Sequence, residues 1–169
     1  MHMITKRLLV GNIEDAARPP AQIGALLLVA EEQDISAPSW LTYAKIPFKE
    51  FGEPDASALC QAVDWIESHI ADDRVMVCCR AGMGRSVSVV IAYLCCAEHL
   101  TYEEAVKLVL TRRPGGLPLP KLQETVEKVL ATRRGRICRS DDPVDPLPSA
   151  PPQPPEPKRR PPTRGRGCF

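Results

Sequence analysis

The stretch of sequence that decides the fold reads Val-Met-Val-Cys-Cys-Arg-Ala-Gly-Met-Gly-Arg-Ser over residues 75–86. It begins with apolar residues typical of a buried strand, and an apolar run typical of a helix starts at Val87. Between them lies a short loop with Cys79 at its start and Arg85 at its end. Such a loop turns backbone N–H groups inward as an anion-binding nest, to which the helix N-terminus adds its positive dipole end. A cysteine beside that nest is placed to attack a phosphoester.

The residue types in this loop fit a phosphate site. Cys79 is the expected nucleophile, because a positive surround favours the thiolate. Arg85 offers a planar fork for two phosphate oxygens. A buried strand that ends in inert cysteines and a glycine turn is the alternative interpretation, but it gives no role to an arginine at a helix start. The phosphate-binding loop is expected to comprise Arg80, Ala81, Gly82, Met83, Gly84 and Arg85.

This segment resembles the active-site loop of the cysteine-dependent protein tyrosine phosphatases, specifically of their small dual-specificity branch. The resemblance extends over roughly residues 4–131. It includes an opening strand and turn at 7–12, strands at 23–29 and 43–48, and a helix that ends at a proline over 101–114. The resemblance implies that family's fold, with the loop at the carboxyl end of a central strand.

The resemblance also implies roles for residues outside the loop. The hydroxyl of Ser86 would stabilise the Cys79 sulfur as a leaving group, and Ser86 could also be the N-cap of the following helix. The family places an aspartate, the general acid, on the loop upstream of the nucleophile, residues 49–55 here, called the acid loop below. This chain has Glu50 at the matching place, one methylene longer than aspartate, and Asp55 as the alternative.

Cys78 is a second departure, because the family normally has a histidine before the nucleophile. Cysteine is a weak hydrogen-bond donor, so the Cys79 thiolate is expected to be less favoured than in typical relatives. A redox role, in which Cys78 traps oxidised Cys79, is one interpretation. Adjacent strand residues point to opposite faces, however, so a small buried side chain is the preferred interpretation of Cys78.

The order of elements predicts an α/β fold, a single domain whose central, mostly parallel sheet is flanked by helices. Residues 1–132 are the expected dual-specificity phosphatase-like catalytic domain, and 133–169 the expected disordered tail. The expected strands are 8–11, 25–29, 42–46 and 74–78, and the expected helices are 56–71, 86–98, 102–112 and 119–131.

The tail differs from the rest of the chain in composition. Residues 133–169 hold nine Lys and Arg against four Asp and Glu, and ten of the 18 prolines lie between Pro143 and Pro162. Such a stretch is expected to be extended, either as a ligand for a protein partner or as a solvated tail without one.

Several other classes of function lack support. The three histidines are scattered and no cysteines have metal-ligand spacing, so no metal or cofactor is expected. The basic residues of the tail lack interleaved aromatics, which argues against nucleic-acid binding. No apolar run reaches the ~18–20 residues of a membrane span, and a signal peptide is not evident. The number of cysteines is odd, at seven, and Cys60, Cys78, Cys95 and Cys96 lie in apolar contexts, which indicates free thiols and predicts a cytoplasmic location.

The resemblance implies a phosphoric monoester hydrolase that acts through a phosphocysteine intermediate. A phosphorylated protein is the expected substrate, with phosphotyrosine and also phosphoserine and phosphothreonine as targets. Relatives that act on polyphosphorylated inositides carry extra lysines inside the loop, whereas residues 80–84 here carry only Arg80 as a charged residue. Two alternatives stay open: the same chemistry on a non-protein phosphate (a lipid or an RNA 5′ end), and a phospho-binding module with little turnover.

Overall fold

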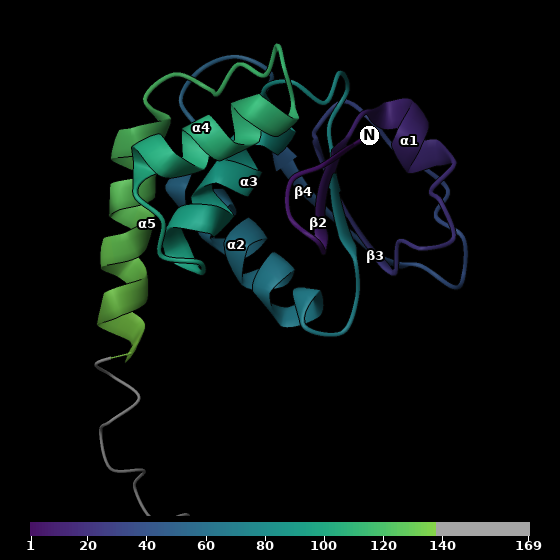
Figure 1. The fold of residues 1–169 in the computed structure, drawn as a ribbon, viewed down its shortest axis with the longest axis horizontal. Helices are drawn as coiled ribbons and strands as arrows, with labels where there is room; N and C mark the ends of the chain where they lie inside the picture. Colours follow the sequence, from purple (N-terminus) through teal and green to yellow (C-terminus); the bar gives the residue numbers. More distant parts are fainter. Residues whose placement is uncertain (138–169) are drawn as a thin grey trace, which may run out of the picture.

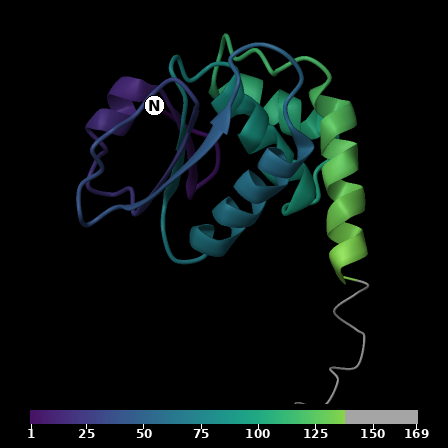
Figure 2. The same ribbon diagram turned by 180° about the vertical axis from the view of Figure 1, so that it is seen from behind.

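A five-stranded sheet forms the centre of the molecule, as the computed structural model, which describes residues 1–137, shows (Figures 1 and 2). The strand order is β1-β2-β5-β3-β4. β1 pairs antiparallel with β2, and the remaining pairs are parallel. The strands are β1 (His2–Met3), β2 (Leu8–Gly11), β3 (Ala25–Ala30), β4 (Thr42–Phe48) and β5 (Val75–Cys78). The predicted α/β fold with a mostly parallel sheet is confirmed.

Helices cover both faces of this sheet. The short helix α1 (Ile13–Ala17) lies on one face, and the other four lie on the opposite face (Figures 1 and 2). α2 and α3 pack on the sheet, α4 packs against α3, and α5 packs against α2 and α3. Every residue of α3 is buried, so α3 is the central helix of the helical layer. These four helices are α2 (Ala56–Ile70), α3 (Arg85–Cys96), α4 (Tyr102–Arg112) and α5 (Leu122–Ile137).

The position of β3 and β5 inside the sheet explains why their sequences are apolar without alternation. All residues of β3 and β5 are buried, because both faces of these strands are covered by helices or loops. β4 is an edge strand and carries Pro47. Proline has no N–H to donate to a neighbouring strand, and an edge strand tolerates this because one of its sides is unpaired. The burial pattern therefore makes β5, which ends at Cys78, the rigid support of the loop that follows it.

Two short elements were not predicted. β1 has two residues, and α1 has five. α1 begins with a capping box, in which the Asn12 side chain accepts from the Asp15 N–H at 2.9 Å and the Asp15 carboxylate accepts from the Asn12 N–H at 3.0 Å. Asn followed three residues later by Asp is the signal that could have revealed this helix.

The last helix differs from the predicted 119–131 at both ends. It begins at Leu122, because Pro120 disfavours a helical conformation at Leu119 and Lys121 has a positive φ of 53°. It continues to Ile137, beyond the boundary expected at 132. Arg133 forms ion pairs with Asp64 and Glu67 of α2, so residues 133–137 continue the helix of the domain. The rest of the predicted tail, 138–169, lies outside the described residues.

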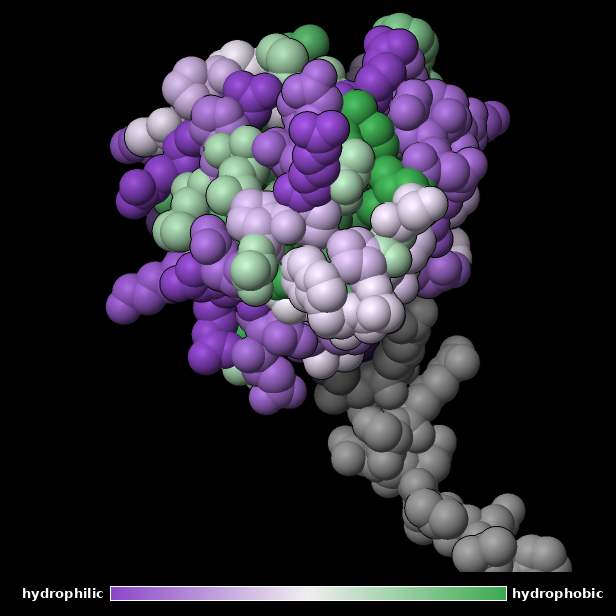
Figure 3. Space-filling view, turned by 90° about the vertical axis from the view of Figure 1, so that its right-hand side faces the viewer, coloured by the Kyte–Doolittle hydropathy of each residue, from purple (hydrophilic) through white to green (hydrophobic). Residues whose placement is uncertain are grey.

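The surface is mixed in character. Figure 3 shows the side of the molecule on which α1 lies, where hydrophilic residues surround smaller groups of hydrophobic ones. Folded domains commonly expose this mixture. No helix within residues 1–137 is long and apolar enough to cross a membrane.

Candidate active site

The site forms where three loops meet beyond the carboxyl end of the sheet. These are the acid loop after β4, the phosphate-binding loop after β5, and residues 113–121 between α4 and α5, which gather at the top of Figure 1. They enclose a cavity of about 440 Å³. The cavity is lined by Glu50, Phe51, Gly52, Cys79, Ala81, Met83, Gly84, Arg85, Leu117, Pro118, Leu119 and Pro120. The predicted nucleophile, arginine and preferred acid therefore lie around one cavity.

Cys79 sits at the base of this cavity, where only 2% of its surface is exposed. Its Sγ lies 3.2 Å from the Ser86 Oγ. Burial by itself raises the pKa of the Cys79 thiol. Hydrogen bonds outweigh burial and leave this pKa below its ordinary value; the donors are the Ser86 hydroxyl and the backbone N–H groups of Ser86, Gly82 and Met83. The loop is thus built to hold a thiolate, the form that attacks.

The loop needs glycine at position 82. Gly82 has a φ of 66°, and a Cβ there would stand 2.8 Å from the carbonyl oxygen of Gly11. This conformation aims the Gly82 N–H at the sulfur. The end of β2, at Gly11, therefore packs closely against the loop.

Arg85 is buried, with 3% of its side chain exposed, and it lines the cavity. Its guanidinium forms a two-point ion pair with Glu32, at 2.5 and 2.7 Å, and also donates to the Phe48 carbonyl at 3.2 Å. The hydrogen bonds from Arg85 hold the pKa of Glu32 at about 2. Glu32 is not among the residues that line the cavity, so its carboxylate fixes the arginine from outside the phosphate site.

Glu32, which contacts Arg85 of the candidate site, was not singled out from the sequence. It lies just after β3, at the carboxyl end of a buried parallel strand. Polar residues in that position gather at the same edge of a sheet as the loop after β5, and this was the available signal.

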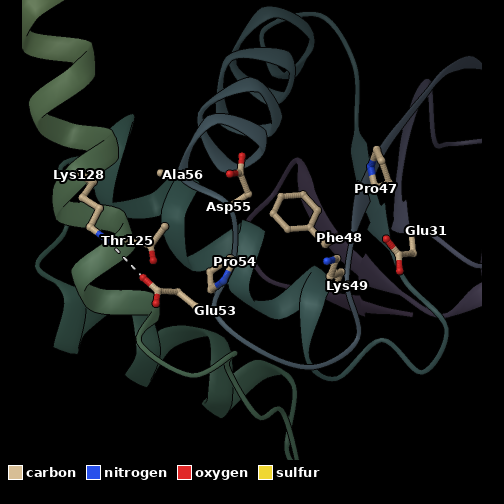
Figure 4. A pocket seen from close by; sticks show the side chains of 10 residues that line it. All are labelled: Glu31, Pro47, Phe48, Lys49, Glu53, Pro54, Asp55, Ala56, Thr125 and Lys128. Carbon is tan, nitrogen blue, oxygen red and sulfur yellow. Dashed lines mark hydrogen bonds and ion pairs between the residues drawn. The ribbon is translucent and has the colours of Figure 1, made fainter.

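Glu50 and Asp55 have different positions on the acid loop. Glu50 lines the cavity with Cys79, and its carboxylate pairs with Arg80 of the phosphate-binding loop. Asp55 is the N-cap of α2, where its carboxylate accepts from the Ala58 N–H at 2.8 Å. Asp55 lines a second cavity, of about 510 Å³, whose lining does not include Cys79 or Arg85 (Figure 4). The geometry therefore favours Glu50 of the two candidate acids.

The second cavity shows how the acid loop is held. Glu53 forms ion pairs with Lys128 of α5 at 3.2 Å and with Lys121 at 3.7 Å. Figure 4 shows the ion pair between Glu53 and Lys128 at one side of this cavity. The loop is thus attached to the phosphate-binding loop through Glu50 and to α5 through Glu53.

Ser86 has one of its two expected roles. The N-cap of α3 is Gly84, without a side-chain cap, and the helix begins at Arg85. Because Ser86 lies inside the first turn, its hydroxyl is directed to the Cys79 sulfur. The expectation that Ser86 caps the helix is therefore wrong, whereas its contact with the sulfur fits the role in phosphocysteine breakdown.

Cys78 is fully buried, and burial raises the pKa of its thiol. A Cβ on Gly11 would stand 2.7 Å from the Cys78 Sγ, which shows how tightly this thiol is packed against β2. Cys78 and Cys79 are both free thiols. The position agrees with the interpretation of Cys78 as a small buried side chain.

Two further residues support the loop, and neither was singled out from the sequence. Arg113 donates to the carbonyls of Gly82, at 2.9 Å, and Ala81, at 3.4 Å. Ser88 donates to the Gly84 carbonyl at 2.9 Å and accepts from the Leu119 N–H at 2.8 Å. They join the phosphate-binding loop to the segment between α4 and α5. Within residues 1–137, no group of three or more His, Cys, Asp or Glu side chains could hold a metal ion.

Comparisons with known proteins find segments similar to this chain in two phosphatases. Over 64 residues, it is 38% identical to MAP kinase phosphatase with leucine-rich repeats protein 3 of Dictyostelium discoideum, a match that covers 38% of this chain and 8% of that protein. Over 62 residues, it is 39% identical to phosphatidylglycerophosphate phosphatase PTPMT1 of Arabidopsis thaliana, a match that covers 36% of this chain and 18% of that protein. The matches thus span less than a fifth of either relative.

The fold agrees with solved structures of the same kind. The crystal structure of human DUSP28 superposes with a TM-score of 0.68 at 19% identity, over 80% of this chain and 99% of that chain. The model of the family described as dual specificity phosphatase, catalytic domain, matches residues 13–129. This match covers most of the described domain, including the acid loop and the phosphate-binding loop. The resemblance predicted from the sequence is confirmed, and the chain belongs to the dual-specificity phosphatase family.

Proposed function

We propose that the protein is a phosphoprotein phosphatase that hydrolyses phosphotyrosine and also phosphoserine and phosphothreonine through a phosphocysteine intermediate. One observation carries the proposal: the Cys79 thiol, with its lowered pKa, shares a cavity with Arg85 and Glu50. These three groups supply a nucleophile, a phosphate clamp and a proton donor.

The first step transfers the phosphoryl group to the protein. The Cys79 thiolate attacks phosphorus, an S–P bond forms and the P–O bond to the leaving group breaks. The Arg85 guanidinium and the loop N–H groups stabilise the phosphoryl oxygens. Protonated Glu50 gives its proton to the leaving oxygen, which departs as an alcohol or phenol.

The second step returns the enzyme to its starting state. The Glu50 carboxylate takes a proton from water, whose oxygen attacks phosphorus and breaks the S–P bond. The Ser86 hydroxyl, 3.2 Å from the sulfur, donates a hydrogen bond to the departing Cys79 thiolate. Inorganic phosphate leaves and Glu50 is again protonated.

A lipid phosphate is the second candidate substrate, because one relative is a phosphatidylglycerophosphate phosphatase. A panel of substrates separates the two. We expect phosphate release from tyrosine-, serine- and threonine-phosphorylated peptides to exceed release from vesicles that contain phosphatidylglycerophosphate. The opposite order would replace the phosphoprotein proposal with the lipid one, and binding of phosphopeptide without release would indicate a binding module.

The choice of acid has its own test. With a poor leaving group such as phenol, protonation limits the rate, so Glu50→Gln is expected to lower kcat by about 100-fold. Asp55→Asn keeps a side-chain acceptor at the N-cap of α2 and is expected to change kcat by less than about threefold. A large loss in Asp55→Asn with a small loss in Glu50→Gln would assign the acid to Asp55.

A further inference from the structure

Exposed apolar side chains concentrate at the mouth of the candidate active site. The described residues include six large hydrophobic side chains that are exposed, and three of them line the cavity that contains Cys79. Phe51 is 82% exposed, Leu117 75% and Met83 39%. Apolar surface that gathers at one place, rather than scattering singly, marks a site of contact with another molecule.

The two most exposed of these side chains belong to loops that are tied to the phosphate-binding loop. The Leu117 N–H donates to the Met83 carbonyl at 2.8 Å. Phe51 follows Glu50, whose carboxylate pairs with Arg80. The backbone at Leu117 and at Phe51 is therefore linked to the loop that would hold a phosphate above Cys79.

Phe51 and Leu117 form the rim of the cavity, and the wall between this rim and the phosphate site is also apolar. Glu50 and Arg85 are the only carboxylate and guanidinium among its lining side chains, and the remaining wall includes Ala81, Met83, Pro118, Leu119 and Pro120. The group next to the phosphate must therefore lose water without gaining many polar partners. An aryl ring does so readily, whereas the hydroxyls of an inositol ring or the backbone amides next to a phosphoserine do so at a cost.

From this geometry we propose that Phe51 and Leu117 are specificity-determining residues that select a phosphotyrosine with an apolar residue next to it in the substrate protein. The phosphotyrosine ring lies along the apolar wall, and the neighbouring side chain packs on the Phe51 ring and the Leu117 side chain at the mouth. This inference rests on the proposed phosphoprotein phosphatase function and adds the identity of the preferred sequence.

The test compares three peptides that differ at one place each. The first carries phosphotyrosine followed by leucine, the second has serine in place of that leucine, and the third has phosphoserine in place of phosphotyrosine. For the wild-type chain we expect kcat/KM on the first peptide to exceed that on the second by about five- to tenfold, the effect of one modest apolar contact. The third peptide is expected to be the poorest substrate of the three.

Variants at Phe51 and Leu117 test the ratio of kcat/KM on the first peptide to kcat/KM on the second. In the double variant Phe51→Ala, Leu117→Ala, the preference for leucine over serine should fall below about twofold, whereas Phe51→Leu should retain most of it. Trp40→Ala is the matched control, because Trp40 is 53% exposed but does not line the cavity. It should keep the wild-type ratio. Urea unfolding is the control for folding, and each variant should have the same unfolding midpoint as the wild-type chain.

Three results would overturn the inference, and they are distinguishable. Equal kcat/KM of the wild-type chain on the first two peptides would remove the role of the rim and leave the proposed function intact. An unchanged preference in the double variant would do the same. Faster release from vesicles of phosphatidylcholine with phosphatidylinositol phosphate than from every peptide, lost in the double variant, would assign the rim to lipid. If no peptide is hydrolysed at all, the proposed function itself fails.

Discussion

At the scale of the residue, the nucleophile is stabilised without the histidine that typical relatives carry before it. Cys78 occupies that place and is packed in the core, so it offers no hydrogen bond to the phosphate site. The lowered pKa of the Cys79 thiol depends on the Ser86 hydroxyl and on loop N–H groups.

The first prediction concerns Ser86→Ala. The lost hydrogen bond should raise the pKa of the Cys79 thiol, so the ascending limb of kcat/KM against pH moves to higher pH. Breakdown of phosphocysteine should also slow, because the departing thiolate has lost a donor, and kcat should fall by about tenfold or more. Pre-steady-state kinetics with 4-nitrophenyl phosphate, whose good leaving group makes phosphocysteine breakdown the slower step, should show a burst of 4-nitrophenol, and a pH profile checks the other effect. A profile that superposes on the wild-type profile would contradict the role of Ser86.

The second prediction concerns the carboxylate that holds Arg85. Glu32→Gln cannot form the two-point ion pair, so the guanidinium loses its fixed orientation and kcat/KM should fall by about 10- to 100-fold. Affinity for vanadate, measured by inhibition, should fall with it. Glu31→Gln is the matched control, because Glu31 lies one position earlier and does not contact Arg85. Equal effects of the two variants would refute a positioning role for Glu32.

The same ion pair has a defined pH dependence. The pKa of Glu32 is about 2 in the folded chain and 4.5 ordinarily, so the unfolded chain binds the proton first as the pH falls. The ion pair therefore stabilises the fold above about pH 4.5 and loses this effect as the pH falls toward about 2. The difference in free energy of unfolding between wild type and Glu32→Gln should be constant from about pH 8 to pH 5 and shrink below about pH 4.5. Urea titrations check this, and a difference that does not change with pH would contradict it.

At the scale of the element, one strand and three loops build the site. β5 ends against β2 and β3 and is buried throughout, so it fixes where the phosphate-binding loop begins. Gly82 then passes close to Gly11 of β2. Arg113 and Ser88 hold the loop from the side of the helices. The loop is thus supported by both layers of the fold.

The third prediction concerns the close approach at Gly82. In Gly82→Ala the added Cβ meets the Gly11 carbonyl and the backbone is strained at φ 66°, so stability should fall by about 2 kcal/mol and kcat/KM by more than about tenfold. Gly135→Ala is the matched control, because no atom lies within 4 Å of its added Cβ and the position is in α5. It should raise stability by about 0.5 kcal/mol and leave activity unchanged. Similar destabilisation in both variants would contradict the steric argument.

Particular elements show what the sequence could predict. The strand at Val75–Cys78 and the helix after Arg85 were predictable, because uninterrupted apolar runs on either side of a glycine-containing loop have few other solutions. The start of α5 was not, because nothing in the sequence indicates that Lys121 has a positive φ, and the helix begins only after it, at Leu122. Glu32 could be assigned to the edge of the sheet that holds the loops, but its pairing with Arg85 could not, because the two are distant in the sequence and only the sheet order brings β3 beside β5.

At the scale of the whole molecule, α5 is the last helix of the described domain and packs on its helical layer. This helix packs against α2 and α3, and Arg133 pairs with two carboxylates of α2. Lys128 of the same helix pairs with Glu53 of the acid loop. α5 therefore contributes both to the stability of the domain and to the position of the acid loop.

The fourth prediction places the boundary of the folded domain after α5. Removal of residues 138–169 should leave the urea midpoint and the rate on phenyl phosphate unchanged, as expected if the predicted tail makes no stabilising contact. Arg133→Met in the full chain should lower stability by about 1 kcal/mol, because two ion pairs are lost. A lower midpoint on removal of 138–169, with no effect of Arg133→Met, would show that the boundary lies further along the chain.

The proposed mechanism requires that Cys79 itself takes the phosphoryl group in this cavity and that the reaction proceeds in the presence of a chelator. The most direct measurement is phenol release from phenyl phosphate by the purified chain under reducing conditions with chelator, beside Cys79→Ser. Turnover by the wild-type chain and none by Cys79→Ser is the predicted result, and a rapid quench of the reaction with 4-nitrophenyl phosphate, a better leaving group, should find phosphate on Cys79. Turnover that survives in Cys79→Ser, or a wild-type chain that binds vanadate but releases no phenol between about pH 5 and pH 8, would contradict it.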